Sequence, residues 1–343
     1  MTGESVSPSA FIELAHGAGG RASRRLTDEL FVPAFRNPVL ERLADAAELP
    51  FGNGRLALTT DAFVVRPLRF PGGSIGTLAV HGTINDLAVA GADPIALTAA
   101  FLLEAGLART VLEHEVQAMA AAALAVGVAI VGGDTKVVEH GKADGLYIVT
   151  TGVGAVDPRV QLGADRVCAG DRILLTGPIG DHGITILLAR GDLDLQVDLR
   201  SDTRSVLPFT RALRAALPAA LRWMRDPTRG GVGTALNELA EAADLAIELD
   251  ERAIPIRDGV RGACELLGLD PLHIANEGQC LAVVAEDAAE AALAAWRAVP
   301  GGERAAIIGR VGDGGGRVVY SRSELGGKRV VDMLVGDPLP RIC

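Results

Sequence analysis

Apolar residues in this chain alternate between strand-like and helix-like patterns, with glycines between them. Short runs at 56–65, 95–101, 145–156, 172–176 and 280–284 are rich in β-branched residues, which is typical of strands. Longer segments at 74–90 and 110–125 have the length and spacing of helices. Ser74 is placed to cap the first of these helices and Gly91 to end it. The pattern predicts an α/β (α+β) chain.

Acidic residues recur beside glycines or at the ends of the predicted strands. The segments concerned are Thr60-Asp61, Asn85-Asp86, Gly132-Gly133-Asp134-Thr135-Lys136, Asp226-Pro227-Thr228-Arg229-Gly230-Gly231 and Asn276-Glu277-Gly278. We expect the apolar strand at 129–131 to end at its glycine pair. Glycines let a ligand approach the backbone, carboxylates suit Mg²⁺, and Lys136 could meet a phosphate.

Each segment also has a plainer interpretation. Asp134 and Lys136 would be ordinary charges on a surface hairpin turn, and Glu277 a turn carboxylate in water. Asp86 would be a cap or half of a buried salt bridge, because a carboxylate among apolar residues needs a cation or several donors.

A glycine cluster near the start, at Gly17, Gly19 and Gly20, precedes a helical pattern from Ser23 to Phe31. Backbone N–H groups at such a place can hold phosphates. The spacing fits only a relaxed G-x-G-x-x-A, and no solid apolar strand precedes it, so we expect a flexible glycine flap and not a dinucleotide fold. No G-x-x-x-x-G-K-[ST] occurs in the chain.

Composition bounds the function. With 343 residues and 49% hydrophobic content, the chain suits two domains, which we place at 11–157 and 158–332 after a variable extension at 1–10. A net charge of −10 argues against nucleic acid as a partner. The uncharged run 116–133 contains Gln117 and Gly127, so we expect no membrane span. We also expect no signal peptide. The four cysteines form no C-x-x-C, which favours the cytoplasm and no disulfide framework.

The last residues, 333–343, predict a mobile tail that ends in Pro340-Arg341-Ile342-Cys343. Prolines favour an extended path there, long enough to carry the thiol of Cys343 across a domain. The alternative is a chance cysteine on a frayed end.

Taken together, the five acidic segments and the terminal Pro-Arg-x-Cys resemble the aminoimidazole ribonucleotide synthetase (PurM-like) superfamily, and within it the members that mature hydrogenases. The resemblance covers nearly the whole chain and keeps the motif order. It implies two α/β domains, a homodimer in which two first domains pair to form a barrel, and ATP bound in the cleft.

The resemblance also implies an activity. A carbamoyltransferase, HypF, would load a carbamoyl group onto Cys343, and this chain would be an ATP-dependent carbamoyl dehydratase that converts it to a thiocyanate. The cyano group would pass to an iron on the HypC–HypD complex for the nickel–iron hydrogenase site.

Residue roles follow from the same resemblance. Asp61, Asp86 and Asp134 would bind Mg²⁺, and Glu277 would be the base, with Lys136 orienting it and Asp86 the competing candidate. The nucleotide would be held by a set of residues from four places in the chain: Gly17, Gly19, Gly20, Asp61, Gly132, Gly133, Asp134, Thr135, Asp226 and Thr228.

Two alternatives stay open. A different ATP-using member of the superfamily, of the selenophosphate synthetase or thiamine monophosphate kinase type, would phosphorylate a small molecule and would not need Cys343. A non-catalytic carrier or scaffold would bind nucleotide and dock its tail on a partner without consuming ATP.

Overall fold

The computed structural model of the chain describes residues 12, 16, 20–191, 197–312, 316–323, 326–334, 339 and 341–343. Its first half contains α1 (Gly20–Leu26), the π-helical turn η2 (Thr27–Phe31), α2 (Val32–Phe35), η3 (Leu40–Arg42), β1 (Ala47–Phe51), β2 (Gly54–Phe63), β3 (Arg69–Phe70), β4 (Gly73–Ser74), α3 (Ile75–Val89), β5 (Ala92–Glu104), α4 (Arg109–Val126), β6 (Ala129–Val138) and β7 (Leu146–Val156).

The second half contains η4 (Ala164–Arg166), β8 (Arg172–Leu175), α5 (Asp181–Ala189), α6 (Leu207–Ala216), β9 (Leu221–Arg225), α7 (Gly231–Ala243), β10 (Ile247–Asp250), α8 (Asp258–Leu267), η5 (Pro271–His273), β11 (Leu281–Val284), η6 (Glu286–Ala288), α9 (Ala289–Arg297), β12 (Ala306–Val311), β13 (Val319–Arg322) and β14 (Lys328–Val331). No helix in the part of the chain that the structure describes is long and apolar enough to cross a membrane.

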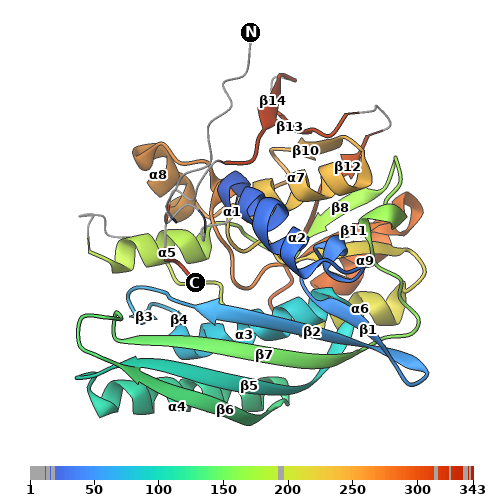
Figure 1. The fold of residues 1–343 in the computed structure, drawn as a ribbon. Helices are drawn as coiled ribbons and strands as arrows, with labels where there is room; N and C mark the ends of the chain where they lie inside the picture. The colour runs from blue at the N-terminus through green and yellow to red at the C-terminus, as the bar shows by residue number, and fades with distance from the viewer. Residues whose placement is uncertain are drawn as a thin grey trace.

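A five-stranded sheet in the order β1-β2-β7-β5-β6 organises the first half, with α3 and α4 on one of its faces (Figure 1). Ser74 caps α3 as expected, through a capping box with Thr77, and Gly91 follows the helix with φ +77°. In β2 the side chains of Ala57, Thr59 and Phe63 alternate onto the buried face. This alternation decides which polar residues of β2 face α3.

The other face of this sheet is left open. Ile95 of β5 is 55% exposed, and the edge strand β6 exposes Val131 (67%) and Val137 (65%). Exposed apolar residues on an unpaired edge strand mark a surface suited to pairing with another chain.

The second sheet has seven strands in the order β14-β13-β10-β12-β8-β11-β9. Successive residues of β8 and β11 belong to different core clusters, because helices cover both faces of the sheet. Ile173 and Leu281 pack with α7, whereas Leu174 and Ala282 pack with the cluster that contains residues of α6 and α9. The apolar runs that predicted these strands reflect this double burial.

One hydrophobic cluster runs across both halves. It includes Ile84 and Ala88 of α3, Phe209 of α6, and Ile342 near the C-terminus. Figure 1 shows the C-terminus lying between the first sheet and α5. The predicted mixed α/β architecture is confirmed, and the junction of its two halves carries the groups described next.

Candidate functional site

Carboxylates from the first half meet at the junction. Asp61 extends the inward-facing series of β2, and Asp86 lies near the end of α3, where the Thr59 hydroxyl donates a hydrogen bond to it at 2.7 Å. Burial raises the pKa of Asp61 and raises that of Asp86 well above its ordinary value. For Asp86 the nearby carboxylates of Asp226 and Asp61 act in the same direction.

The second half adds Asp226, directly after β9. Burial, together with the charges of Asp45 and Asp61, raises the pKa of Asp226 to about 8, although Arg225 acts in the opposite direction. Arg225 holds Asp45 at 2.7 Å and Glu238 at 3.0 Å. Burial also raises the pKa of Asp45, to about 6. The raised pKa values therefore reflect a region in which several carboxyl groups are buried close together.

Glu277 lies in the loop that precedes β11 and is 2% exposed. Its Oε1 has no hydrogen-bond partner among the described residues, and burial raises its pKa well above the ordinary value. Its backbone is fixed, because its N–H donates to Asp202 at 3.0 Å and its carbonyl accepts from Asn85 at 3.2 Å. A buried carboxyl in a rigid loop with an unpaired oxygen is suited to proton transfer.

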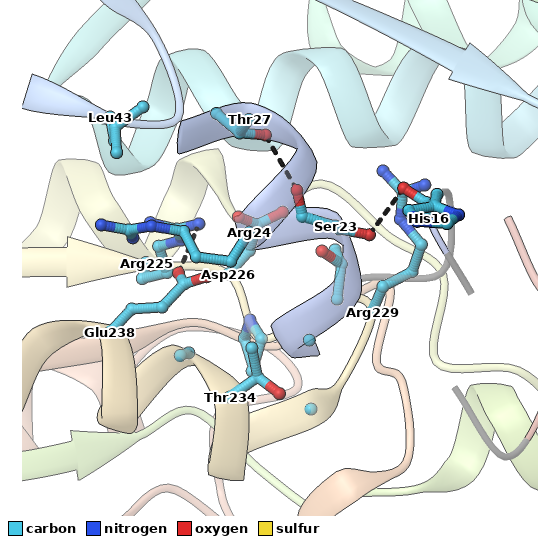
Figure 2. A pocket seen from close by; sticks show the side chains of 15 residues that line it. His16, Ser23, Arg24, Thr27, Leu43, Arg225, Asp226, Arg229, Thr234 and Glu238 are labelled. Carbon is cyan, nitrogen blue, oxygen red and sulfur yellow. Dashed lines mark hydrogen bonds and ion pairs between the residues drawn. The ribbon is translucent and has the colours of Figure 1, made fainter. Parts of the chain in front are cut away.

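Beside the carboxylates lies a cavity of about 350 Å³, covered by α1 (Figure 2). Gly20, Asp226, Thr228 and Arg229 are among the residues that line it, and the start of α7 closes one side. Gly231, the first residue of α7, has φ +62°, and a Cβ there would lie 2.5 Å from the Leu272 carbonyl oxygen. A glycine-rich helix start with a threonine and an arginine suits a phosphate group.

Gly20 lines one cavity with Asp226 and Thr228, and the family resemblance placed all three among the residues that would hold the nucleotide. Gly17 and Gly19 lie outside the described residues.

Within the cavity, Ser23 of α1 donates to the His16 carbonyl at 2.9 Å and accepts, through its own carbonyl, a hydrogen bond from Thr27 (Figure 2). The first of these bonds ties α1 to His16.

The Gly132–Lys136 segment differs from our expectation. β6 does not end at its glycines but continues through Val138, paired in parallel with β5. Gly133 is needed there because a Cβ would lie 1.8 Å from the Ala99 carbonyl oxygen. Gly133 therefore permits close strand pairing, and the two glycines do not form a turn.

The side chains of β6 also lie apart from the buried carboxylates. Lys136 Nζ pairs with Asp134 at 2.7 Å, and this hydrogen bond lowers the pKa of Asp134. Both side chains are more than 60% exposed, at 70% and 62%. Within one chain, no hydrogen bond or ion pair joins Lys136 to Glu277, because Lys136 projects from the exposed sheet edge. Thr135 and Gly132 are exposed on the same strand.

The buried carboxylates fit Mg²⁺ by their chemistry. No group of three metal-binding side chains is already gathered at bonding distance among the residues that the structure describes. However, the charges of Asp226 and Asp61 raise the pKa of Asp86, and that of Asp61 raises the pKa of Asp226, so hard oxygen ligands share one region. A divalent cation would relieve that repulsion.

The C-terminal end is docked in this structure. Val64, just after β2, donates its N–H to the Cys343 carbonyl at 3.0 Å, and Ile342 is 1% exposed. Arg341 pairs with Asp144 at 2.6 Å. The thiol-bearing residue therefore ends beside the strand that carries Asp61. Pro340 lies outside the described residues.

Sequence reasoning missed Asp45, Arg225 and Asp202. The signal for Asp45 was weak, because it is one acid in a loop before β1 and has no glycine beside it. Arg225 had a clearer signal, since an arginine at the end of a strand, directly before Asp226, needs a carboxylate partner where it is partly buried.

Known proteins resemble this chain over nearly its full length. Residues 43–156 match the family model "AIR synthase related protein, N-terminal domain", and residues 169–321 match the corresponding C-terminal domain model. The carbamoyl dehydratase HypE of Azotobacter vinelandii is 52% identical over 332 residues, which cover 97% of each chain.

Solved structures agree with this. A crystal structure of the hydrogenase maturation protein HypE in complex with ATP matches with a TM-score of 0.81 and 46% identity, covering 96% of this chain and 99% of the other. A HypE chain in a HypE–HypF complex matches with a TM-score of 0.86 and 41% identity, covering 90% and 99%.

Proposed function

Because the chain belongs to the HypE family of AIR synthase related proteins, we propose that it is a carbamoyl dehydratase that uses ATP to turn an S-carbamoyl group on its own Cys343 into an S-cyanate. The product supplies the cyanide ligand of the iron in [NiFe]-hydrogenase. The observation that carries the proposal for this chain is the docked C-terminus, which brings Cys343 to the end of the strand bearing Asp61.

The chemistry needs two steps. The carbamoyl oxygen first attacks the γ-phosphate of ATP, which releases ADP; the nitrogen gives one of its two protons to solvent, which leaves a phosphorylated imidate on sulfur. The nitrogen then loses its remaining proton to a base while the C–O bond to phosphate breaks, which forms the C≡N bond and releases phosphate. The first step needs compensation of the triphosphate charge, and the second needs a base.

The cavity under α1 is the proposed ATP site, because a phosphate would meet the start of α7, Thr228 and Arg229 there. Mg²⁺ would neutralise phosphate charge, and Asp61, Asp86 and Asp226 would hold it, with Asp45 beside them. Arg225 keeps Asp45 in place through its 2.7 Å ion pair. The positive charges of Mg²⁺ and Arg225 would lower the pKa values of the neighbouring carboxyls and so favour their ionised forms.

Glu277 is the proposed base. Burial raises the pKa of Glu277, so once this carboxyl is ionised it is a stronger base than an ordinary carboxylate. The charge of Arg229 works against the burial and favours the ionised form. The hydrogen bonds of the Glu277 backbone to Asp202 and Asn85 fix the backbone from which the side chain extends.

We further propose a homodimer that forms through β6 and the open face of the first sheet, giving a barrel. Pairing would bury Val131 and Val137 and place Asp134 and Lys136 against a second chain, where they would help to hold nucleotide and orient Glu277. We propose that the chain has two domains, at 11–157 and 158–332. The tail at 333–343 would leave its docked position when Cys343 is loaded.

HypF is the proposed source of the carbamoyl group, since a relative of this chain forms a HypE–HypF complex. HypC–HypD is the proposed acceptor. All four cysteines are free thiols, which suits the cytoplasmic location that we propose.

A comparison of ATP turnover by the loaded chain with turnover by Cys343→Ser tests the assignment. The dehydratase predicts that ATP consumption requires the carbamoylated Cys343. Turnover that survives the substitution would indicate a small-molecule kinase, and no turnover in either protein would indicate a carrier.

A further inference from the structure

The docked C-terminus is held from two sides. On one side, Val64 and Arg66 donate their N–H groups to the carbonyls of Cys343 and Arg341 at 3.0 and 3.2 Å, as an added strand would be held. Arg341 has φ +59°, a strained value for a residue with a Cβ. The Ile342 carbonyl between these two points the other way, into the protein.

His182 of α5 meets that carbonyl. Its Nε2 lies 2.6 Å from the Ile342 oxygen, and its Nδ1 lies 2.7 Å from the Ser201 hydroxyl. A carbonyl only accepts hydrogen bonds, so Nε2 carries the proton. A neutral ring then accepts at Nδ1 from Ser201, whose oxygen in turn accepts from the Thr203 N–H at 3.1 Å. Burial lowers the pKa of His182 to about 4, which keeps the ring neutral.

The same loop reaches the proposed base. Asp202, next to Ser201, accepts hydrogen bonds from the Glu277 N–H at 3.0 Å and from Gln279 at 3.2 Å. The hydrogen bonds therefore run from the Ile342 carbonyl through His182 and Ser201 to the loop that fixes Glu277. Docking of the tail and placement of the base share one structural element.

We propose that His182 is a positioning residue that fixes the register of the docked tail, so that Cys343 is presented to Glu277 in one defined position. This inference rests on the proposed dehydration of Cys343. His182 acts on the docked state alone, and hence on dehydration, while loading uses the undocked tail.

There is a physical reason why His182 affects the docked tail and not the undocked one. In the undocked tail, water satisfies the Ile342 carbonyl, whereas in the docked tail this carbonyl is buried and depends on His182. Without the donor, docking leaves a buried carbonyl unpaired, which lowers the docking equilibrium about tenfold or more.

Three substitutions separate the hydrogen bond from packing. His182→Phe keeps a ring beside Phe70, whose centroid lies 5.6 Å from that of His182, but it has no donor. His182→Gln can place an N–H near the position of Nε2 and is the matched control. Ser201→Ala leaves the ring in place and removes the partner of Nδ1, together with the acceptor of the Thr203 N–H.

Two rates are measured on each full-length protein: ATP-dependent dehydration of the carbamoylated tail, and release of Cys343 by a carboxypeptidase from the unloaded tail. The first is proportional to the docked fraction and the second to the undocked fraction. Their ratio therefore follows the docking equilibrium, whichever state predominates.

The proposal expects the ratio to fall about tenfold in His182→Phe and less in Ser201→Ala, and to stay near the wild-type value in His182→Gln. Loading, which uses the undocked tail, should not become slower in any of the three variants. An unchanged ratio in a folded His182→Phe protein, or an equal loss in His182→Gln, would overturn it. If His182→Phe fails to fold, an unchanged ratio in Ser201→Ala overturns it. A wild-type chain that loads but never dehydrates would refute the proposed function, while carboxypeptidase release would still test docking.

Discussion

Replacement of Asp226 by asparagine should stabilise the protein while it impairs the reaction. Asp226 is 6% exposed, and burial with the charges of Asp45 and Asp61 raises its pKa from 3.8 to about 8. Because the folded-state pKa of this acid is raised, the ionised form opposes folding. The penalty is absent below about pH 4, where the unfolded chain is also protonated, and it grows as the pH rises toward 8.

The magnitude follows from the same values. A pH of about 7 is roughly 3 units above the pKa of 3.8 that the carboxyl has in the unfolded chain, whereas the folded carboxyl is mostly protonated at this pH. The free energy of unfolding is therefore lower by about 4 kcal/mol than it is in acid. At about pH 5 the loss is about 2 kcal/mol. Asparagine keeps the size and an acceptor oxygen but cannot ionise. Any cost of the amide itself is independent of pH and cancels in the comparison.

The assay is urea unfolding of the wild type and Asp226→Asn without Mg²⁺ at both pH values. We expect the stability advantage of Asp226→Asn to be larger at about pH 7 than at about pH 5, by about 2 to 3 kcal/mol. The dehydration rate should fall, because a ligand for the proposed cation is lost. An advantage that does not change with pH, or one that grows toward acid, would refute the reasoning that burial holds this carboxyl protonated.

Three further predictions follow from the same geometry. Glu277→Gln should lower the dehydration rate by roughly a hundredfold or more while loading of Cys343 stays normal, as mass spectrometry of the tail would report; dehydration at the normal rate would exclude Glu277 as the base. Mg²⁺ should raise the melting temperature more at about pH 8 than at about pH 6, because Asp61, Asp86 and Asp226 bind it only when ionised; equal shifts at both pH values in a thermal melt would contradict this. Val131→Glu should place like charges in the proposed β6 interface and yield monomers in analytical ultracentrifugation, whereas an unchanged dimer mass would count against that interface.

Local patterns in the sequence were sufficient where local physics decides the structure. α3 begins after Ser74 and ends before Gly91, because the cap and the left-handed glycine act within one turn of the helix. The run 145–156 is a strand because its alternate residues are buried against α3. The tertiary neighbours of these elements had no such local signal, and only the family resemblance grouped Asp61, Asp86, Asp226 and Glu277.

One local interpretation failed. We interpreted Gly132-Gly133 as the end of a strand, but β6 continues through both glycines, and Gly133 allows it to lie close to the Ala99 carbonyl of β5. The prolines of the tail predict an extended, mobile segment, and in its docked state Leu339 and Ile342 are 4% and 1% exposed in the core between the two halves. Two apolar residues in so short a tail were the available signal, since an exposed tail has no need of them.

His182 and Asp45 could not be identified in the sequence, because each has its significance through a partner far away in the chain. His182 contacts Ile342, and Asp45 contacts Arg225. Such pairs leave no periodic trace, and only the folded arrangement brings them together.

The most direct test of the account is the intact mass of the C-terminal peptide after the chain is incubated with carbamoyl phosphate, HypF and MgATP. We predict a carbamoyl adduct on Cys343 that loses one water molecule only when ATP is present. An adduct that forms but keeps its water in the presence of MgATP would contradict the central claim that this chain dehydrates its own terminal thiocarbamate.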